Sequence, residues 1–235
     1  RLCFIIPEYQ PETATHFNYL YKFIYSLNEE TNFFLMIERG GQPEFLKTSS
    51  CYVQKFKILP LKLMENFLMI FYLRLNGYQD FYVHYSFFSA FNASLTVKAL
   101  GGRTFYWNCG LPWQYRRSLA REIFELLTYK LITYLVTGTE GLKKEYSRHY
   151  HLPADKIKVL PNWIDVARFQ PKPENFDKIK SRINISSAQK VVLFAHHLSR
   201  RKGAHYLPEI VKLLKEEPVV LLIVCTGPER KNLEL

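Results

Sequence analysis

Short apolar runs alternate with helix-like segments along the chain. Continuous apolar runs are typical of buried parallel strands, and apolar positions spaced by three and four residues indicate helices. The pattern predicts strands at 2–6, 33–37, 52–57, 80–84, 103–107, 131–137, 157–160, 190–195 and 219–225. It predicts helices at 16–28, 61–76, 87–100, 115–129, 140–150, 204–215 and 229–235. This order predicts an α/β fold whose parallel sheets are covered by helices on both faces.

A change of composition after residue 160 divides this pattern. Prolines punctuate the segment, polar residues dominate from 172 to 187, and a new strand–helix–strand unit begins at Lys190. We therefore expect an N-terminal domain at 1–170, a linker at 171–189 and part of a second domain at 190–235. With only its first strands, the second domain would expose apolar surface, so we expect a fragment or a partner.

The charge balance favours anionic partners. The 235 residues include 32 basic and 21 acidic side chains, which gives a net charge of +11. Nucleic acid, sugar nucleotides and the acidic face of a membrane all fit this charge, and simple solubility is the alternative. The cations gather at a strand end and no nucleic-acid-binding module is recognisable, so we expect no nucleic-acid partner.

The cysteines and the hydropathy indicate the cellular compartment in which the protein works. Cys3, Cys51, Cys109 and Cys225 show neither metal-ligand spacing nor a disulfide framework, which favours a reducing compartment. No apolar run approaches the roughly 18 residues of a membrane span, and no signal-peptide pattern is present. We expect a cytoplasmic protein, either free or peripheral at the inner face of the membrane, with no bound metal.

The segment KVVLFAHHLSRRKG, residues 190–203, contains the clearest candidate site. A buried strand breaks into two histidines and three consecutive cations, and Gly203 opens the next helix. In open α/β sheets a ligand lies beyond the carboxyl ends of the strands, and a helix start offers unpaired N–H groups to an anion. The segment predicts a phosphate or diphosphate site, and a solvated cationic turn is the alternative.

Three segments, in this order, resemble the retaining glycosyltransferases of family 4. Residues 136–140 (VTGTE) and 156–165 (KIKVLPNWID) are similar to the family's "ki.viPNGvD" signature, with Trp163 at the usual glycine. Residues 192–203 are similar to "vLFvGRL...KG", and residues 223–230 to "ivG.GPe...L". Residues 4–12 look like the family's first strand–loop–helix unit. The resemblance covers essentially the whole chain and implies the GT-B fold, in which two Rossmann-like domains face each other.

The resemblance also implies a reaction and a set of residues. Family members transfer a sugar from a nucleoside-diphosphate donor to an acceptor with retention of configuration, and they need no metal or other cofactor. The donor binds the C-terminal domain and the acceptor mainly the N-terminal one. Without a metal, the growing negative charge of the leaving diphosphate is stabilised by cationic side chains and helix N-termini. The positions that match for donor diphosphate binding are His197, Arg201, Lys202 and Gly203, and those for donor nucleotide binding are Gly227 and Pro228.

One departure concerns the family's glycine–arginine pair, which is His196-His197 in this chain. Histidine matches the charge of arginine only when it is protonated. Arg200 and Arg201 are the nearest compensating cations. The departure favours an alternative function, a catalytically inactive GT-B-like protein that binds a sugar nucleotide or a glycan.

The catalytic and acceptor positions depart as well. Many members place a histidine after the strand equivalent to 103–107, where Asn108 stands here; it could orient a hydroxyl but not act as a base. His84, at the end of the preceding strand, is the second candidate, and a structural histidine is the alternative. The acceptor loop, a glycine pair in the family, falls at Glu12, Thr13 and Ala14, where helix capping is the alternative role.

The resemblance leaves the acceptor open between a glycan and a lipid-linked sugar. Residues 61–78 are strongly apolar and aromatic, and residues 115–130 carry four cations. Both segments fit a lipid-linked acceptor at an anionic membrane surface, and a core helix and a solvated helix face are the alternatives. The family's second carboxylate motif would lie past Leu235. We therefore expect this chain to be a fragment that is inactive alone.

Overall fold

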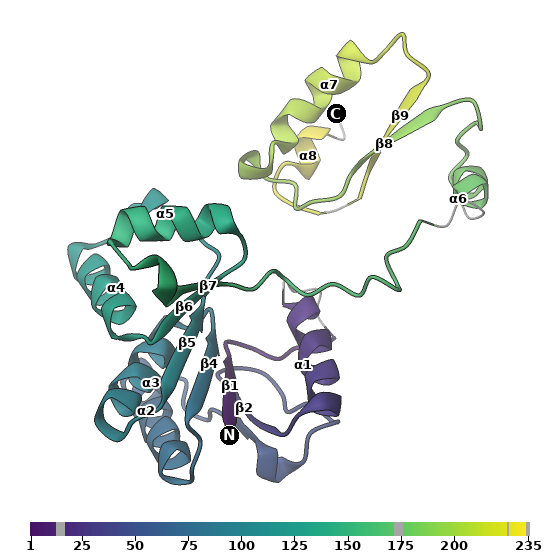
Figure 1. Cartoon of the computed structure of the whole chain (residues 1–235). Coiled ribbons are helices and arrows are strands. Elements are labelled where there is room, and N and C mark those ends of the chain that lie inside the picture. Colours follow the sequence, from purple (N-terminus) through teal and green to yellow (C-terminus); the bar gives the residue numbers. More distant parts are fainter. Residues whose placement is uncertain (13–16, 172–175, 225, 234–235) are drawn as a thin grey trace. The chain divides into compact units, whose positions relative to one another are not determined.

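The computed structural model describes residues 1–12, 17–171, 176–224 and 226–233. The chain forms two compact units, Arg1–Ile164 and Asp165–Leu235, and each has a parallel sheet of its own (Figure 1). The α/β class expected from the sequence is thus confirmed. Residues 171–189, expected to be a linker, fall within the second unit and include α6 (Phe176–Arg182).

The first unit contains a seven-stranded parallel sheet in the order β3-β2-β1-β4-β5-β6-β7. Its strands are β1 (Leu2–Ile6), β2 (Phe33–Ile37), β3 (Cys51–Val53), β4 (Asp80–His84), β5 (Arg103–Trp107), β6 (Tyr134–Thr137) and β7 (Ile157–Val159). The chain runs outward from β1 to β3 and then returns to β4 on the other side of β1. This reversal makes the carboxyl ends of β1 and β4 a topological switch point, where open α/β sheets bind ligands.

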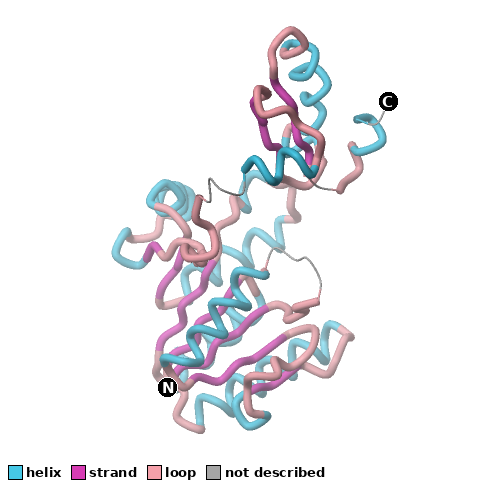
Figure 2. Tube along the Cα trace, turned by 90° about the vertical axis from the view of Figure 1, so that its right-hand side faces the viewer, coloured by secondary structure: helices cyan, strands magenta, loops and turns pink. Residues whose placement is uncertain are grey.

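Helices cover both faces of this sheet (Figures 1 and 2). Helix α1 (Asn18–Glu30) packs on one face, where its residues Leu20 and Ile24 share a core with Phe4 and Leu35. The opposite face is covered by α2 (Leu59–Leu75), α3 (Phe87–Leu100), α4 (Leu119–Leu131) and α5 (Glu140–Tyr150). Burial of apolar area between the helices and the sheet is the main stabilising contribution.

Three predicted boundaries in this unit are wrong, each for a local reason. The strand expected at 52–57 ends at Val53, because after the N–H of Gln54, which still donates to Ile37 of β2, those of Lys55 and Phe56 bond a carboxylate of α2. The helix expected at 115 begins at Leu119, because Ser118 caps it by accepting from the N–H of Arg121 at 3.4 Å. That helix continues to Leu131, so the strand expected from 131 begins at Tyr134.

The second unit is smaller, and within its described residues the sheet pairs only β8 (Lys190–Phe194) with β9 (Val219–Ile223). Its described helices are α6, α7 (Leu207–Leu213) and α8 (Arg230–Leu233), and a small core forms around Leu198 and Leu207. The exposed Val192 and Leu193 on β8 fit the expectation of apolar surface on this unit. Sequence patterning missed α6, since it lies in the polar stretch.

The carboxylate that binds the backbone after β3 belongs to Glu65 of α2. It accepts hydrogen bonds from the hydroxyl of Tyr52 at 2.8 Å and from the backbone N–H groups of Lys55 at 2.8 Å and Phe56 at 3.1 Å. Burial raises the pKa of Glu65, but these hydrogen bonds outweigh it and hold the pKa below its ordinary value. The charged carboxylate therefore stabilises the turn between β3 and α2.

We expect Glu65→Gln to lower the free energy of unfolding by about 1–3 kcal/mol at neutral pH. A carboxyl group with a depressed folded pKa contributes fully above its ordinary pKa and loses that contribution as the pH falls through the folded value. The difference between wild type and variant should therefore shrink below a pH of about 4. Urea unfolding at several pH values measures it, with the exposed Glu29→Gln on α1 as a control. A difference that is constant with pH would contradict this role.

Candidate functional site

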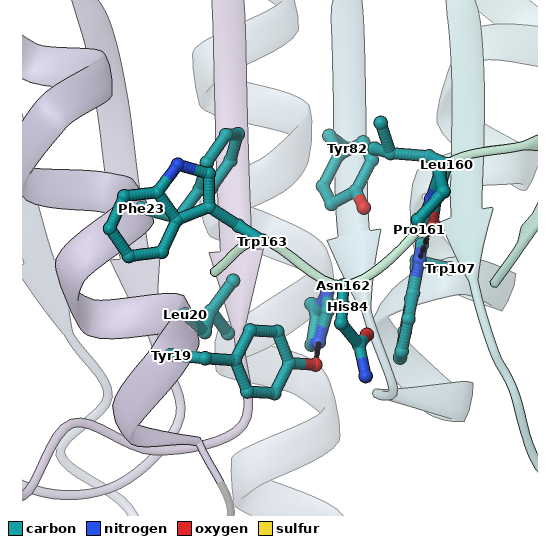
Figure 3. Close-up of a pocket in the computed structure, with 10 residues that line it drawn as sticks. All are labelled: Tyr19, Leu20, Phe23, Tyr82, His84, Trp107, Leu160, Pro161, Asn162 and Trp163. Atoms are coloured by element: carbon teal, nitrogen blue, oxygen red, sulfur yellow. Dashed lines mark hydrogen bonds between the residues drawn. The ribbon is translucent and has the colours of Figure 1, made fainter. Parts of the chain in front are cut away.

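The carboxyl edge of the first unit's sheet brings two predicted strand ends together around His84. His84 ends β4 and Trp107 ends β5, and their rings stack with centroids 4.2 Å apart and planes 11° apart. The hydroxyl of Tyr19 on α1 lies 3.0 Å from Nε2 of His84 (Figure 3). Burial raises the pKa of Tyr19, and nearby Cys109 raises it further, so this hydroxyl keeps its proton. His84 is thus a buried ring with a fixed orientation.

A cavity of about 110 Å³ lies beside this histidine (Figure 3). The indole N–H of Trp107 donates to the carbonyl of Leu160 at 3.2 Å and so fixes the segment that follows β7. The lining residues come from α1, the ends of β4 and β5, and this segment: Tyr19, Leu20, Phe23, Tyr82, His84, Trp107, Leu160, Pro161, Asn162 and Trp163. The volume suits a few water molecules or one polar substituent of a sugar. Sequence reasoning identified His84 alone among these residues as a site candidate.

The other catalytic candidate, Asn108, has its amide engaged within the protein. Its side-chain nitrogen donates to the hydroxyls of Tyr106 at 3.2 Å and Tyr129 at 3.1 Å, and its oxygen accepts from the N–H of Gly110 at 2.9 Å. These contacts hold the loop after β5. They favour a positioning role for Asn108, and direct contact with a substrate stays a prediction.

A second cavity, of about 360 Å³, lies between this loop and the start of α4. Arg116, Arg117 and Arg121 line it. Glu125, 4% exposed, pairs with Arg117 and accepts from the hydroxyl of Tyr150 at 3.3 Å. Arg117 is therefore neutralised, whereas Arg116 and Arg121 are exposed and available to an anion.

Tyr85 packs against two rings that line the first cavity and itself lines the second. Its ring lies 5.2 Å from that of His84 and 4.9 Å from that of Trp107, and it lines the second cavity. Its backbone has a φ of 58°, which is rare for a residue with a bulky side chain. Strained backbone of this kind clusters at functional sites, where surrounding contacts maintain it.

Sequence reasoning missed a polar network at the same edge, centred on Glu38. This residue follows β2 directly, and its carboxylate accepts from Nζ of Lys62 at 3.0 Å, from Oγ of Ser89 at 2.6 Å and from Oγ of Ser86. The carboxylate lies at the N-terminus of α3, where a negative charge is favourable. The one available signal was a charged residue immediately after a buried strand.

In the second unit, the cationic segment Arg200–Lys202 forms a single 3₁₀ turn after β8. The N–H groups of Lys202, Gly203 and Ala204 donate to carbonyls of the same turn at 3.0, 3.0 and 3.2 Å. These three N–H groups are therefore satisfied within the turn, and the helix expected from Ala204 begins only at Leu207. The three cationic side chains have no carboxylate partner among the described residues, so charge for an anion comes from them.

The loops after β8 and β9 are tied together at the carboxyl edge of the small sheet. The N–H of Leu198 donates to the carbonyl of Thr226 at 3.0 Å, and the N–H of Glu229 donates to the carbonyl of Leu198 at 3.1 Å. A Cβ on Gly227 would lie 2.7 Å from the nitrogen of Leu198. Only glycine allows this approach, which brings the predicted nucleotide residue Gly227 against Leu198, the residue that follows the exposed His197. Gly203 closes the cationic turn with a φ of 78°.

The predicted acceptor loop is described only at Glu12, which is exposed in a turn after β1. Thr13 and Ala14 lie outside the described residues. Within the described ranges, no group of three or more His, Cys, Asp or Glu side chains is placed to hold a metal ion.

The sequence is similar to parts of known glycosyltransferases, although no family model matches it. It is 31% identical over 103 residues to the uncharacterized glycosyltransferase MJ1607 of Methanocaldococcus jannaschii, a match that covers 43% of this chain and 26% of that protein. It is 26% identical over 82 residues to WcaI of Escherichia coli K12, named for a glycosyl transferase role in colanic acid biosynthesis. That match covers 34% of this chain and 20% of WcaI. The predicted resemblance to glycosyltransferases is confirmed.

Solved structures confirm the GT-B type of fold. Alr3699/HepE of Anabaena, solved in complex with UDP, superposes with a TM-score of 0.71 at 13% identity, over 100% of this chain and 64% of that one. The UDP-GlcNAc 2-epimerase of Neisseria meningitidis, bound to UDP-GlcNAc, superposes with a TM-score of 0.62 at 14% identity, over 100% and 68%. The chain thus spans about two thirds of the length of these solved chains, whereas the matches cover only 20% of WcaI and 26% of MJ1607.

Proposed function

We propose that this chain belongs to a glycosyltransferase of the family 4 type, which transfers a sugar from a nucleoside-diphosphate donor to a glycan or lipid-linked acceptor. Transfer proceeds with retention of configuration and without a metal or other cofactor. The observation that carries the proposal is the unpaired cationic turn at 200–202, tied to the 226–229 loop beyond β8 and β9. Relatives named as glycosyltransferases and a structural neighbour that holds UDP support it.

The donor diphosphate binds the cationic turn of the second unit. When the bond between the sugar and the diphosphate breaks, negative charge grows on the phosphate oxygens, and Arg201 and Lys202 stabilise it. His197 adds a full charge only when it is protonated. Gly203 and the loop of Gly227 and Pro228 let the donor approach the backbone closely.

The acceptor binds the first unit at the carboxyl edge around His84. Tyr19 and Trp107 hold the imidazole in one orientation, so that it can position an acceptor hydroxyl in the adjoining cavity. Arg116 and Arg121 offer positive charge to an anionic acceptor group in the larger cavity. We place the protein in the cytoplasm, at the inner face of the membrane where such acceptors are assembled.

Turnover by the protein that carries this chain tests the proposal. UDP-, GDP-, ADP- and dTDP-sugars are offered with glycan and lipid-linked acceptors, and we expect acceptor-dependent release of one nucleoside diphosphate. EDTA should leave the rate unchanged, and NMR of the product should show the anomeric configuration of the donor. Epimerised sugar nucleotide without transfer would contradict the proposal in favour of an epimerase. Tight donor binding without turnover would favour the inactive sugar-nucleotide-binding alternative.

A further inference from the structure

The outward face of α2 is apolar although it faces away from the core. Spaced at three and four residues, the positions that turn away from the sheet form one stripe, which we call the α2 stripe: Leu61, Met64, Phe67, Leu68, Tyr72 and Leu75. Their exposed fractions run from 36% to 64%, and none is charged. A surface helix normally presents its charged residues to solvent and its apolar residues to the core.

The charged residues of α2 lie on its other sides, where they form hydrogen bonds within the first unit. Lys62 bonds Glu38 at 3.0 Å, Glu65 holds the turn after β3, and Nε of Arg74 donates to the carbonyl of Gly101 at 2.6 Å. Glu65 and Asn66, which face inward, are 8% and 2% exposed. The helix also buries Ile70 and Leu73 in the core, so it is apolar on two sides, and the exposed stripe is left for a partner outside the first unit's own core.

The segment leading into α2 continues this surface and adds positive charge. Residues 55–59 read KFKIL and are all exposed, with Ile58 at 67% and Leu59 at 56%. Lys55 and Lys57 thus alternate with large apolar side chains at the helix start. On the same side of the sheet, α3 packs against α2 and adds the exposed Phe88 and Leu95 (Figure 1).

We propose that the α2 stripe and residues 55–59 dock on an anionic lipid bilayer, with α2 lying in the plane of the interface. Apolar side chains on one face of an interfacial helix enter the boundary between headgroups and acyl chains, while neighbouring lysines contact the lipid phosphates. In the described part of the chain no helix is long and apolar enough to cross a membrane, so α2 lies on the bilayer.

The charge pattern selects a membrane over a second copy of the chain. A symmetric dimer through this face would bring the same lysines of two copies together, each copy carrying a net charge of +11. An anionic bilayer instead supplies the opposite charge next to an apolar layer. Docking in this way does not depend on glycosyl transfer, so its failure and the failure of the proposed function are distinguishable.

Co-sedimentation with vesicles tests the docking surface. The protein is mixed with phosphatidylcholine vesicles, with and without phosphatidylglycerol, at low and high salt. We expect binding to the anionic vesicles that weakens as salt rises. The double substitution Phe67→Glu with Leu68→Glu should weaken it by at least about tenfold. Tyr25→Glu, at an equally exposed aromatic residue on α1, should leave it unchanged.

The lysines are tested separately. Replacing Lys55 and Lys57 by glutamine should weaken binding about fivefold per lysine at low salt and much less at high salt. Lys22→Gln on α1 is the matched control. Circular dichroism verifies that every variant keeps the wild-type melting temperature. Absence of binding to anionic vesicles, equal binding by the double glutamate variant, or a dimer that forms through the α2 stripe in place of vesicle binding would each overturn the proposal.

Discussion

Replacing Lys202 by methionine is expected to lower kcat/KM for the sugar nucleotide by about 10²- to 10³-fold. Methionine keeps most of the length of the side chain and removes its charge. The N–H groups of Lys202 and Gly203 are bonded within the turn, so the cationic side chains supply the charge that meets the leaving diphosphate. Because that charge grows as the bond breaks, kcat should fall more than KM rises. Steady-state rates with saturating acceptor measure both constants.

Two further substitutions control this prediction. Lys202→Arg keeps the charge and should recover part of the lost rate, although its geometry differs. Lys212→Met removes an exposed cation from α7 and should leave the rate as in wild type. An equal loss for Lys202→Met and Lys212→Met would mean that overall charge, and not the turn, is responsible.

Gly227→Ala is expected to destabilise the second unit by about 2–4 kcal/mol. The new Cβ would lie 2.7 Å from the nitrogen and 2.8 Å from the carbonyl carbon of Leu198, both backbone atoms that cannot move aside by a rotamer change. The two loops would have to separate, which breaks the hydrogen bonds of Leu198 with Thr226 and Glu229. Amide hydrogen exchange should show faster exchange in β8 and β9.

A glycine of the first unit provides the control variant for Gly227→Ala. Gly41→Ala places a Cβ where no atom lies within 4 Å, so it should leave exchange unchanged throughout. In Gly227→Ala the amides of the seven-stranded sheet should keep their protection, since they belong to a separate compact unit. Unchanged protection in β8 and β9 would show that the loops are not held as tightly as the geometry requires.

The strands were the most predictable part of the fold. Continuous apolar runs such as 2–6 and 33–37 match β1 and β2 in both bounds, because a strand buried on both faces rarely tolerates polar residues. Helix ends were less predictable, since they depend on single hydrogen bonds such as the cap at Ser118.

The outer face of α2 illustrates a further limit of prediction from the sequence. Its apolar residues indicated a core helix by default and a lipid contact as the second interpretation, and only the exposure in the folded unit shows that many of them face away from the core.

The candidate site was predictable where residues close in sequence form it and not where distant residues meet. The cationic turn and the loop at 226–229 follow their strands directly, and both were identified from the motif pattern. The cavity beside His84 needs Tyr19, Trp107 and Asn162, which come from three elements that only the fold brings together. Asn108 illustrates the opposite limit. A motif assigned its position, but its contacts with Tyr106 and Tyr129 depend on packing.

The most direct measurement of the central claim is amide hydrogen exchange of the protein with UDP, GDP, ADP or dTDP bound. The claim is that the loops beyond β8 and β9 hold the donor diphosphate. With one of the four nucleotides, slower exchange should appear at residues 196–203 and 226–229, and Lys202→Met should reduce this protection. Protection confined to the first unit, or no change in these two loops with any of the four nucleotides, would contradict the claim.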